Sequence, residues 1–218
     1  MLEDSTATES LAEQAYSIVE QMIISLELPP GSVFSEGQLS EQIGIGRTPL
    51  REALQKLAHG RLVASLPRRG MMVTDINVVE HLAMLETRKV LDRLIATRAA
   101  KRRTSSHADQ LHAVADKMLK TADSEDTAAF MALDRQCDRI LEIAARNAFA
   151  VQCAAPLHAH CRRFWTAYRH NGDLKESIGL HTALMYSVAD ADQRAAGDAS
   201  DRLMDYLERF TKEALDLI

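Results

Sequence analysis

The residues best suited to chemistry in this chain lie at the start of a predicted helix. The segment 46–51, GRTPLR, places Arg47, Thr48 and Arg51 within about one helical turn. An arginine guanidinium can donate two hydrogen bonds to a guanine edge, and a threonine can contact a phosphate or a thymine methyl group. These residue types at this spacing predict a helix that enters a groove of double-stranded DNA.

Basic residues gather in the same region, although the 218-residue chain has a formal net charge of -5. No lysine or arginine precedes Arg47, whereas six lie between positions 47 and 69 against a single acid, Glu52. A local basic stripe on an acidic protein is typical of a nucleic-acid contact. The alternative is a solvated helix face followed by a charged turn. Together with the helix pattern, the stripe favours DNA binding.

A helix-turn-helix followed by a two-stranded wing must position these side chains. Ser35, followed three residues later by Gln38, has the pattern of a capping box at a helix start. Pro49 lies in the first turn of the next helix, where a missing N–H costs nothing. Residues 1–9 are predicted to be disordered. The expected elements are a helix over about 10–26, a short helix between Ser35 and Gly44, a helix from Gly46, and strands over 62–66 and 71–74 around a turn at 67–70.

After residue 76 the pattern becomes helical throughout. Alanine, leucine, isoleucine and methionine recur at i, i+3 and i+4, as the helices of an antiparallel bundle require. The fold class is therefore predicted to be mostly α: an N-terminal winged helix-turn-helix domain followed by an antiparallel bundle of about six helices. The predicted bundle helices cover 78–102, 107–122, 125–145, 148–169, 174–190 and 192–217.

The motif LSEQIGIGRTPLREALQKL, followed by a wing that ends in Arg-Gly and by a helical segment, resembles the GntR family of bacterial regulators, FadR subfamily. The resemblance covers about 11–218. It implies a DNA-binding domain at 10–75 and an all-helical, FCD-type domain at 76–218 for effector binding and dimerisation. The implied DNA contacts are Arg47, Thr48, Arg51, Arg68, Arg69 and Gly70, with Ser35 and Gln38 as backbone contacts or as helix caps alone.

The resemblance also implies a metal site that this chain only partly retains. Many family members hold a divalent metal with an aspartate, a histidine four residues later and two histidines on later helices. The matching positions here are Asp134, Asp138, His181 and Leu203, so an oxygen donor replaces one histidine and a leucine replaces another. Asp134, Asp138 and His181 could still hold a divalent ion that water completes. The alternative is that both aspartates pair with arginines in a polar pocket.

An effector pocket in the helical domain is the second implied site. Arg88 and Asn147 match family positions, with Asp92 where glutamate is usual, and such a pocket suits a small carboxylate. His158 and His160 lie about 200° apart on one helix, so both cannot face inward. The candidate effector-binding residues are Arg88, Asp134, Asp138, Asn147, Arg163, His181 and Tyr206.

We therefore expect a bacterial, cytoplasmic transcriptional regulator rather than an enzyme. It is expected to repress, to bind a palindromic operator as a homodimer, and to respond to a small-molecule effector. Two alternatives stay open. A metal-dependent enzyme would use Asp134, Asp138 and His181, but no base–nucleophile pair has motif spacing. An architectural DNA binder would need no effector, and polar residues inside the bundle argue against it.

Composition excludes other classes of protein. No run of 18 apolar residues occurs, so a membrane-spanning helix is not expected. The three cysteines, Cys137, Cys153 and Cys161, are odd in number and lack metal-ligand spacing. They are expected to be reduced thiols in a cytoplasmic protein.

Overall fold

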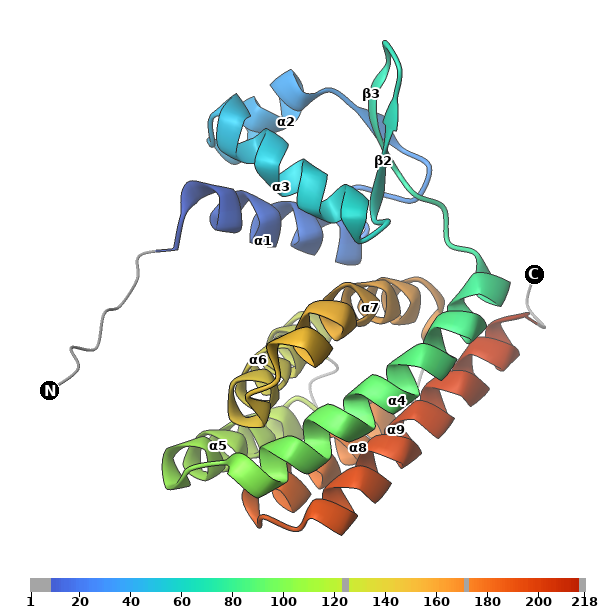
Figure 1. Ribbon diagram of the computed structural model, residues 1–218. Coiled ribbons are helices and arrows are strands. Elements are labelled where there is room, and N and C mark those ends of the chain that lie inside the picture. The colour runs from blue at the N-terminus through green and yellow to red at the C-terminus, as the bar shows by residue number, and fades with distance from the viewer. Residues whose placement is uncertain (1–8, 123–125, 171–172, 216–218) are drawn as a thin grey trace, which may run out of the picture. The chain divides into compact units, whose positions relative to one another are not determined.

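The computed structural model describes residues 9–122, 126–170 and 173–215. The predicted disorder of 1–9 therefore lies, apart from residue 9, outside the described residues. The chain forms two compact units: unit 1 contains the chain up to Ile76 together with Ala159–Ala167, and unit 2 contains Asn77–His158 and the chain from Tyr168 onward. The predicted fold class is confirmed, because a winged helix-turn-helix is followed by a bundle of helices (Figure 1).

Unit 1 combines three helices with a small antiparallel sheet. The sheet has the strand order β1-β3-β2, and Val33 and Phe34 of β1 pair with Met72 and Met71 of β3. The sequence analysis missed β1, because two residues are too few to show an alternating pattern. The elements are α1 (Leu11–Ile24), β1 (Val33–Phe34), α2 (Glu36–Ile43), α3 (Arg47–His59), β2 (Val63–Leu66) and β3 (Gly70–Val73).

Packing inside unit 1 leaves one face of α3 free for solvent. Leu50, Leu54 and Leu57 of α3 are buried and belong to one core cluster with Val19 and Ile23 of α1. Gly44 ends α2 with a φ of 67°, a left-handed conformation that glycine adopts without strain. This short turn fixes the start of α3, so the residues of its first turn that do not face the core are exposed.

Unit 2 is built from helices alone within the described residues. The predicted boundaries agree with the structure to within about three residues. The start of α5 at Ser105, rather than 107, follows from Thr104, whose hydroxyl accepts from the backbone N–H of His107 as an N-cap. In Figure 1, α4 and α9 run side by side, and they also pack in contact. The helices are α4 (Val78–Arg102), α5 (Ser105–Lys120), α6 (Thr127–Ala145), α8 (Asp173–Ala189) and α9 (Gln193–Leu215), together with α7 (Ala148–Tyr168), whose residues 159–167 belong to unit 1.

Two further sequence expectations concern the membrane and the thiols. Among the described residues, none of the helices has the length and apolarity needed to cross a bilayer. Cys137 and Cys161 are buried and Cys153 is exposed, and all three are free thiols.

Candidate DNA interface and effector pocket

The first turn of α3 presents the predicted DNA-reading side chains to solvent. Arg47, Thr48 and Arg51 are all exposed, whereas Leu50 between them is fully buried. The guanidinium of Arg51 donates from Nη2 and Nε to Oε2 of Glu36, at 2.7 and 3.1 Å. Glu36 belongs to α2, so an acid of the preceding helix holds Arg51 in a defined direction.

The wing has a turn whose shape depends on two residues with positive φ. The N–H of Arg69 donates to the carbonyl of Leu66 at 3.0 Å, and Arg68 has a φ of 64°. Gly70 has a φ of 103°, and a Cβ there would lie 2.4 Å from the carbonyl oxygen of Phe34. Gly70 is therefore needed for the close approach of β3 to β1, while Arg68 and Arg69 are exposed at the tip.

Ser35 and Gln38 form the predicted cap of α2. The hydroxyl of Ser35 accepts from the backbone N–H of Gln38 at 3.2 Å and donates to its Oε1 at 2.9 Å. Both side chains are exposed. Capping accounts for their arrangement, and a contact with the DNA backbone remains a prediction.

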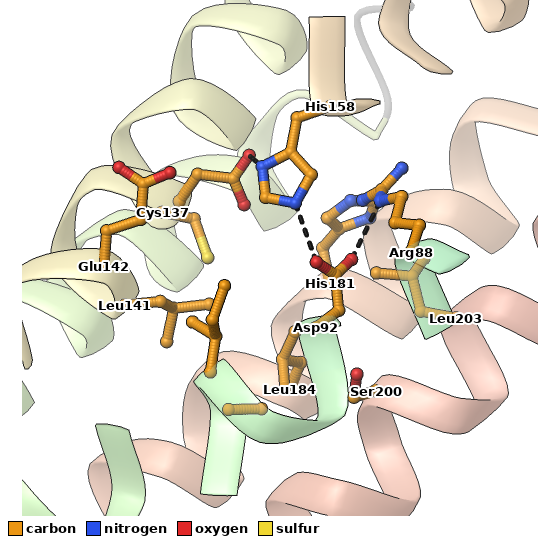
Figure 2. Close-up of a pocket in the computed structure, with 13 residues that line it drawn as sticks. Arg88, Asp92, Cys137, Leu141, Glu142, His158, His181, Leu184, Ser200 and Leu203 are labelled. Carbon is orange, nitrogen blue, oxygen red and sulfur yellow. Dashed lines mark hydrogen bonds and ion pairs between the residues drawn. The ribbon is translucent and has the colours of Figure 1, made fainter. Parts of the chain in front are cut away.

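The interior of unit 2 holds a bridge of charged side chains. The imidazole of His158 lies between two carboxylates, with Nε2 at 2.8 Å from Oδ1 of Asp92 and Nδ1 at 2.9 Å from Oδ2 of Asp138 (Figure 2). Arg88 donates from Nε to the second oxygen of Asp92 at 2.8 Å. The bridge thus joins α4, α6 and α7 through a buried imidazole and two half-buried carboxylates.

The electrostatics of this bridge favour charged partners. Burial disfavours the imidazolium, but the charges of Asp138 and Asp92 outweigh it and raise the pKa of His158 to about 10. Burial likewise disfavours the carboxylate of Asp92, yet His158 and Arg88 lower its pKa to about 2. Each charge is therefore compensated by a neighbour, as buried ions require.

A second buried pair lies on α6 and α8. Nε2 of His181 is 3.0 Å from Oδ1 of Asp134, and Nδ1 donates to the backbone carbonyl of Ser177 at 2.7 Å. Burial lowers and Asp134 raises the pKa of His181, and the net direction is upward. The ring of Phe130 meets the His181 ring edge-on at 5.5 Å. These contacts fix the orientation of the imidazole.

A small cavity of about 20 Å³ opens beside the bridge. This volume suits about one water molecule. Ser200 is 1% exposed, and its hydroxyl has no hydrogen-bond partner. The polar side chains at the cavity are contributed by five helices, α4, α6, α7, α8 and α9, and Figure 2 shows them around one space. The polar and cysteine side chains lining it are Arg88, Asp92, Cys137, Asp138, Glu142, His158, His181 and Ser200.

Comparisons with known proteins show to which family this chain belongs. Residues 11–73 match the model of bacterial regulatory proteins of the gntR family, and residues 83–206 match the FCD domain. The chain belongs to the GntR family of transcriptional regulators. It is 24% identical over 214 residues to the HTH-type transcriptional repressor RspR of Escherichia coli K12, covering 96% of this chain and 94% of that one. It is 28% identical over 203 residues to the fatty acid metabolism regulator protein of Edwardsiella ictaluri, covering 85% and 81%.

Solved structures show the same fold at lower identity. E. coli McbR/YncC has a TM-score of 0.78 at 16% identity, covering 94% of this chain and 99% of that one. A putative GntR regulator from Rhodococcus has a TM-score of 0.66 at 18% identity, covering 95% and 98%. At these identities the likeness concerns the fold alone.

Within this GntR-family regulator, the cavity gathers part of the predicted effector site. Arg88, Asp138 and His181 line it, whereas Asp134 pairs with His181 without lining the cavity itself. The sequence analysis did not assign Asp92, His158 or Ser200 to the site. The spacing of Arg88 and Asp92 at i, i+4 was a signal for their ion pair, whereas Ser200 carries no such signal.

Three predicted effector residues do not line the cavity. Asn147 caps α7, its Oδ1 accepting from the N–H of Ala150 at 3.3 Å. Arg163 lies in unit 1, where Nη1 donates to the carbonyl of Thr74 at 2.8 Å. The hydroxyl of Tyr206 donates to the carbonyl of Asp173 at 3.4 Å. Each side chain has a backbone partner elsewhere, so none of the three is placed at the cavity, and their role in effector binding stays a prediction.

The two histidines of α7 face different surroundings, as their angular separation predicted. His158 lines the cavity, whereas Nε2 of His160 donates to the carbonyl of Gly60 at 2.7 Å within unit 1. Burial lowers the pKa of His160, and its contact with the Gly60 carbonyl is structural.

The predicted metal ligands do not form a metal site as they stand. Within 9–122, 126–170 and 173–215, no group of three or more histidine, cysteine, aspartate or glutamate side chains could hold a metal ion. Asp138 is turned to His158 and Asp134 to His181, and Leu203 offers no donor. The alternative of aspartates paired with basic side chains describes this interior, with histidines rather than arginines as partners.

Proposed function

We propose that this regulator is a homodimeric repressor that acts in the bacterial cytoplasm and binds a palindromic operator through α3 and the wing. We further propose that a small carboxylate, bound in the unit 2 cavity, sets its operator affinity. The name of RspR, a transcriptional repressor similar over nearly the whole chain, supports repression. The exposed first turn of α3 supports direct reading of bases.

The buried hydroxyl of Ser200 is the observation that carries the effector proposal. A polar group that is buried without a hydrogen-bond partner costs about 1–3 kcal/mol. Ser200 presents its unpaired hydroxyl at the wall of a cavity that Arg88 also lines, where a bound group can accept from it. A carboxylate there would accept hydrogen bonds from both groups, and bonds to charged groups are the stronger ones. The unpaired hydroxyl is then explained by function rather than by stability.

The size of the cavity links binding to a change of conformation. A space of about 20 Å³ holds a water but not an organic acid. A ligand must therefore bind a form of unit 2 in which the surrounding helices lie further apart. A ligand that prefers one of two conformations shifts the population toward it, which is what control of operator affinity requires.

Removal of the Ser200 hydroxyl tests the site. We expect Ser200→Ala to leave the ligand-free protein as stable as the wild type or more stable, since an unpaired buried group is lost. We expect the same variant to weaken effector binding about tenfold, which corresponds to about 1.4 kcal/mol. The matched control is Ser187→Ala, because that hydroxyl is satisfied by the carbonyl of Ala183 and lies away from the cavity lining.

The measurement uses full-length protein and acids of two to six carbons. Thermal shifts identify an acid that binds, and fluorescence anisotropy on a duplex selected from a random pool reports whether it weakens DNA binding. Alcohols and amides of the same size serve as the neutral comparison. If only the neutral compounds act, the carboxylate assignment is wrong. If Ser200→Ala binds the active acid as tightly as the wild type, the cavity is not the effector site.

A further inference from the structure

We propose that His158 takes the place of a resident metal ion, so that its imidazolium, bridging Asp92 and Asp138, makes the interior of this FCD domain metal-independent. The geometry of the bridge carries this inference. It does not depend on the identity of the effector, and its test needs neither effector nor DNA.

The number of N–H groups that the His158 ring must donate determines its charge. Both ring nitrogens of His158 lie within 3 Å of a carboxylate oxygen, Nε2 beside Asp92 and Nδ1 beside Asp138. A neutral imidazole has a single N–H, whereas the imidazolium has two. Ionised carboxylates only accept hydrogen bonds, so both contacts are satisfied when the ring carries both protons.

A doubly donating imidazole cannot be a metal ligand. Metal coordination needs the lone pair of an unprotonated ring nitrogen. In His158 both nitrogens are turned to carboxylates, and in His181 one is turned to Asp134 and the other to the carbonyl of Ser177. His158, which bridges two carboxylates, therefore has no lone pair free for a cation.

The sequence shows a matching exchange of side chains. The position where the resemblance implies a third histidine, on α9, is Leu203 here, and Leu203 lines the same cavity as His158. An imidazole is thus absent from α9 and another is supplied by α7. The replacement keeps a cation among the carboxylates while removing the means to coordinate a metal.

The bridge also has the role that a structural cation would have. Asp92, Asp138 and His158 belong to α4, α6 and α7, and the imidazolium joins the carboxylate that Arg88 also pairs with to a second carboxylate on another helix. Removing one partner of a buried ion pair is strongly destabilising, because the remaining charge stays buried. The three helices are therefore held together by a cation that is part of the chain.

The test removes the internal cation and supplies an external one. His158→Ala leaves a ring-sized space between Asp92 and Asp138. We expect its melting temperature to fall, and we expect 10 mM imidazole at a pH where free imidazole is largely protonated to raise it by about 3 °C or more. His112→Ala is the control, since His112 is an exposed side chain of the same unit that lies outside the cavity lining. Imidazole should leave the control and the wild type unchanged.

Metal analysis completes the experiment. Wild-type protein purified without chelator is expected to contain less than about 0.1 metal ion per chain, and its melting temperature is expected to stay constant with Mn²⁺ or Zn²⁺. A stoichiometric metal in the wild type would overturn the proposal. So would a His158→Ala variant that is destabilised but indifferent to imidazole. If this variant does not fold alone, refolding with imidazole is the readout, and failure to recover soluble, helical protein counts against the proposal.

Discussion

Arg51, a predicted DNA contact, already has an acidic partner within the protein. Its guanidinium donates to Glu36 in the DNA-free protein, yet the Arg51 side chain is 61% exposed. Exposed ion pairs contribute between about 0 and 1 kcal/mol, so a guanine or a phosphate can replace Glu36 at little cost. The pair therefore orients Arg51 without holding it back from the operator.

We predict that Arg51→Ala weakens operator binding by about 1–3 kcal/mol, because a bidentate contact to a base is lost. Arg47→Ala is expected to have an effect of the same order. Fluorescence anisotropy with the full-length protein and a selected duplex measures both. Arg202→Ala, an exposed arginine of α9, is the control and should bind normally. An unchanged affinity in either α3 variant would remove that arginine from the reading face.

For single residues, the sequence predicted which side chains lie at the cavity better than it predicted which side chains they contact. Arg88, Asp138 and His181 were assigned to the pocket because they match family positions, and all three line the cavity. The bridge to His158 was not predicted, because His158 and Asp92 are 66 residues apart. Their meeting depends on how three helices pack, and side-chain spacing within one helix contains no such information.

Elements were predicted where a local signal marks their ends. The capping residue Ser35 and the left-handed Gly44 agree with the observed boundaries of α2, because capping acts within four residues. The Thr104 cap was not recognised, so α5 was predicted to begin two residues too late. The strand β1 was missed because it exists only by pairing with β3. That pairing requires Gly70. The sequence analysis proposed Gly70 only as a DNA contact, whereas the structure shows that it also allows β3 to pack closely against β1.

We predict that Gly70→Ala destabilises the wing by about 1–3 kcal/mol. The added Cβ would meet the carbonyl of Phe34 at 2.4 Å, and the φ of 103° is strained for alanine. Urea denaturation of the full-length protein measures the loss. Gly179→Ala is a matched control on helix α8, where an added Cβ meets nothing within 4 Å. It should stabilise by up to about 1 kcal/mol, and equal stability of both variants would show that β1 and β3 can separate freely.

On the scale of the whole molecule, the distribution of charge matters more than its sum. The formal net charge of -5 opposes DNA binding, but the six basic residues between 47 and 69 all belong to unit 1. Because exposed charges are screened beyond about 10 Å, the local stripe decides what this surface attracts. The chain average was therefore a poor guide, and the local pattern was a good one.

The last prediction concerns assembly: the regulator should be a homodimer through unit 2. Two side chains at the junction of α6 and α7 expose large apolar surfaces, Ile143 at 65% and Phe149 at 85%. Such surface is stabilised when a second copy covers it. Light scattering of the full-length protein should give twice the chain mass, and the double variant Ile143→Asp with Phe149→Asp should shift the measured mass toward that of the monomer.

The control for this prediction is Leu11→Asp, at a site in unit 1 that is 57% exposed, and this variant should stay dimeric. A two-fold symmetric protein matches a palindromic operator, so the monomeric variant should bind a full palindrome no more tightly than a half-site. A wild type with the mass of one chain would contradict the dimer itself, and a double variant that stays dimeric would place the interface elsewhere.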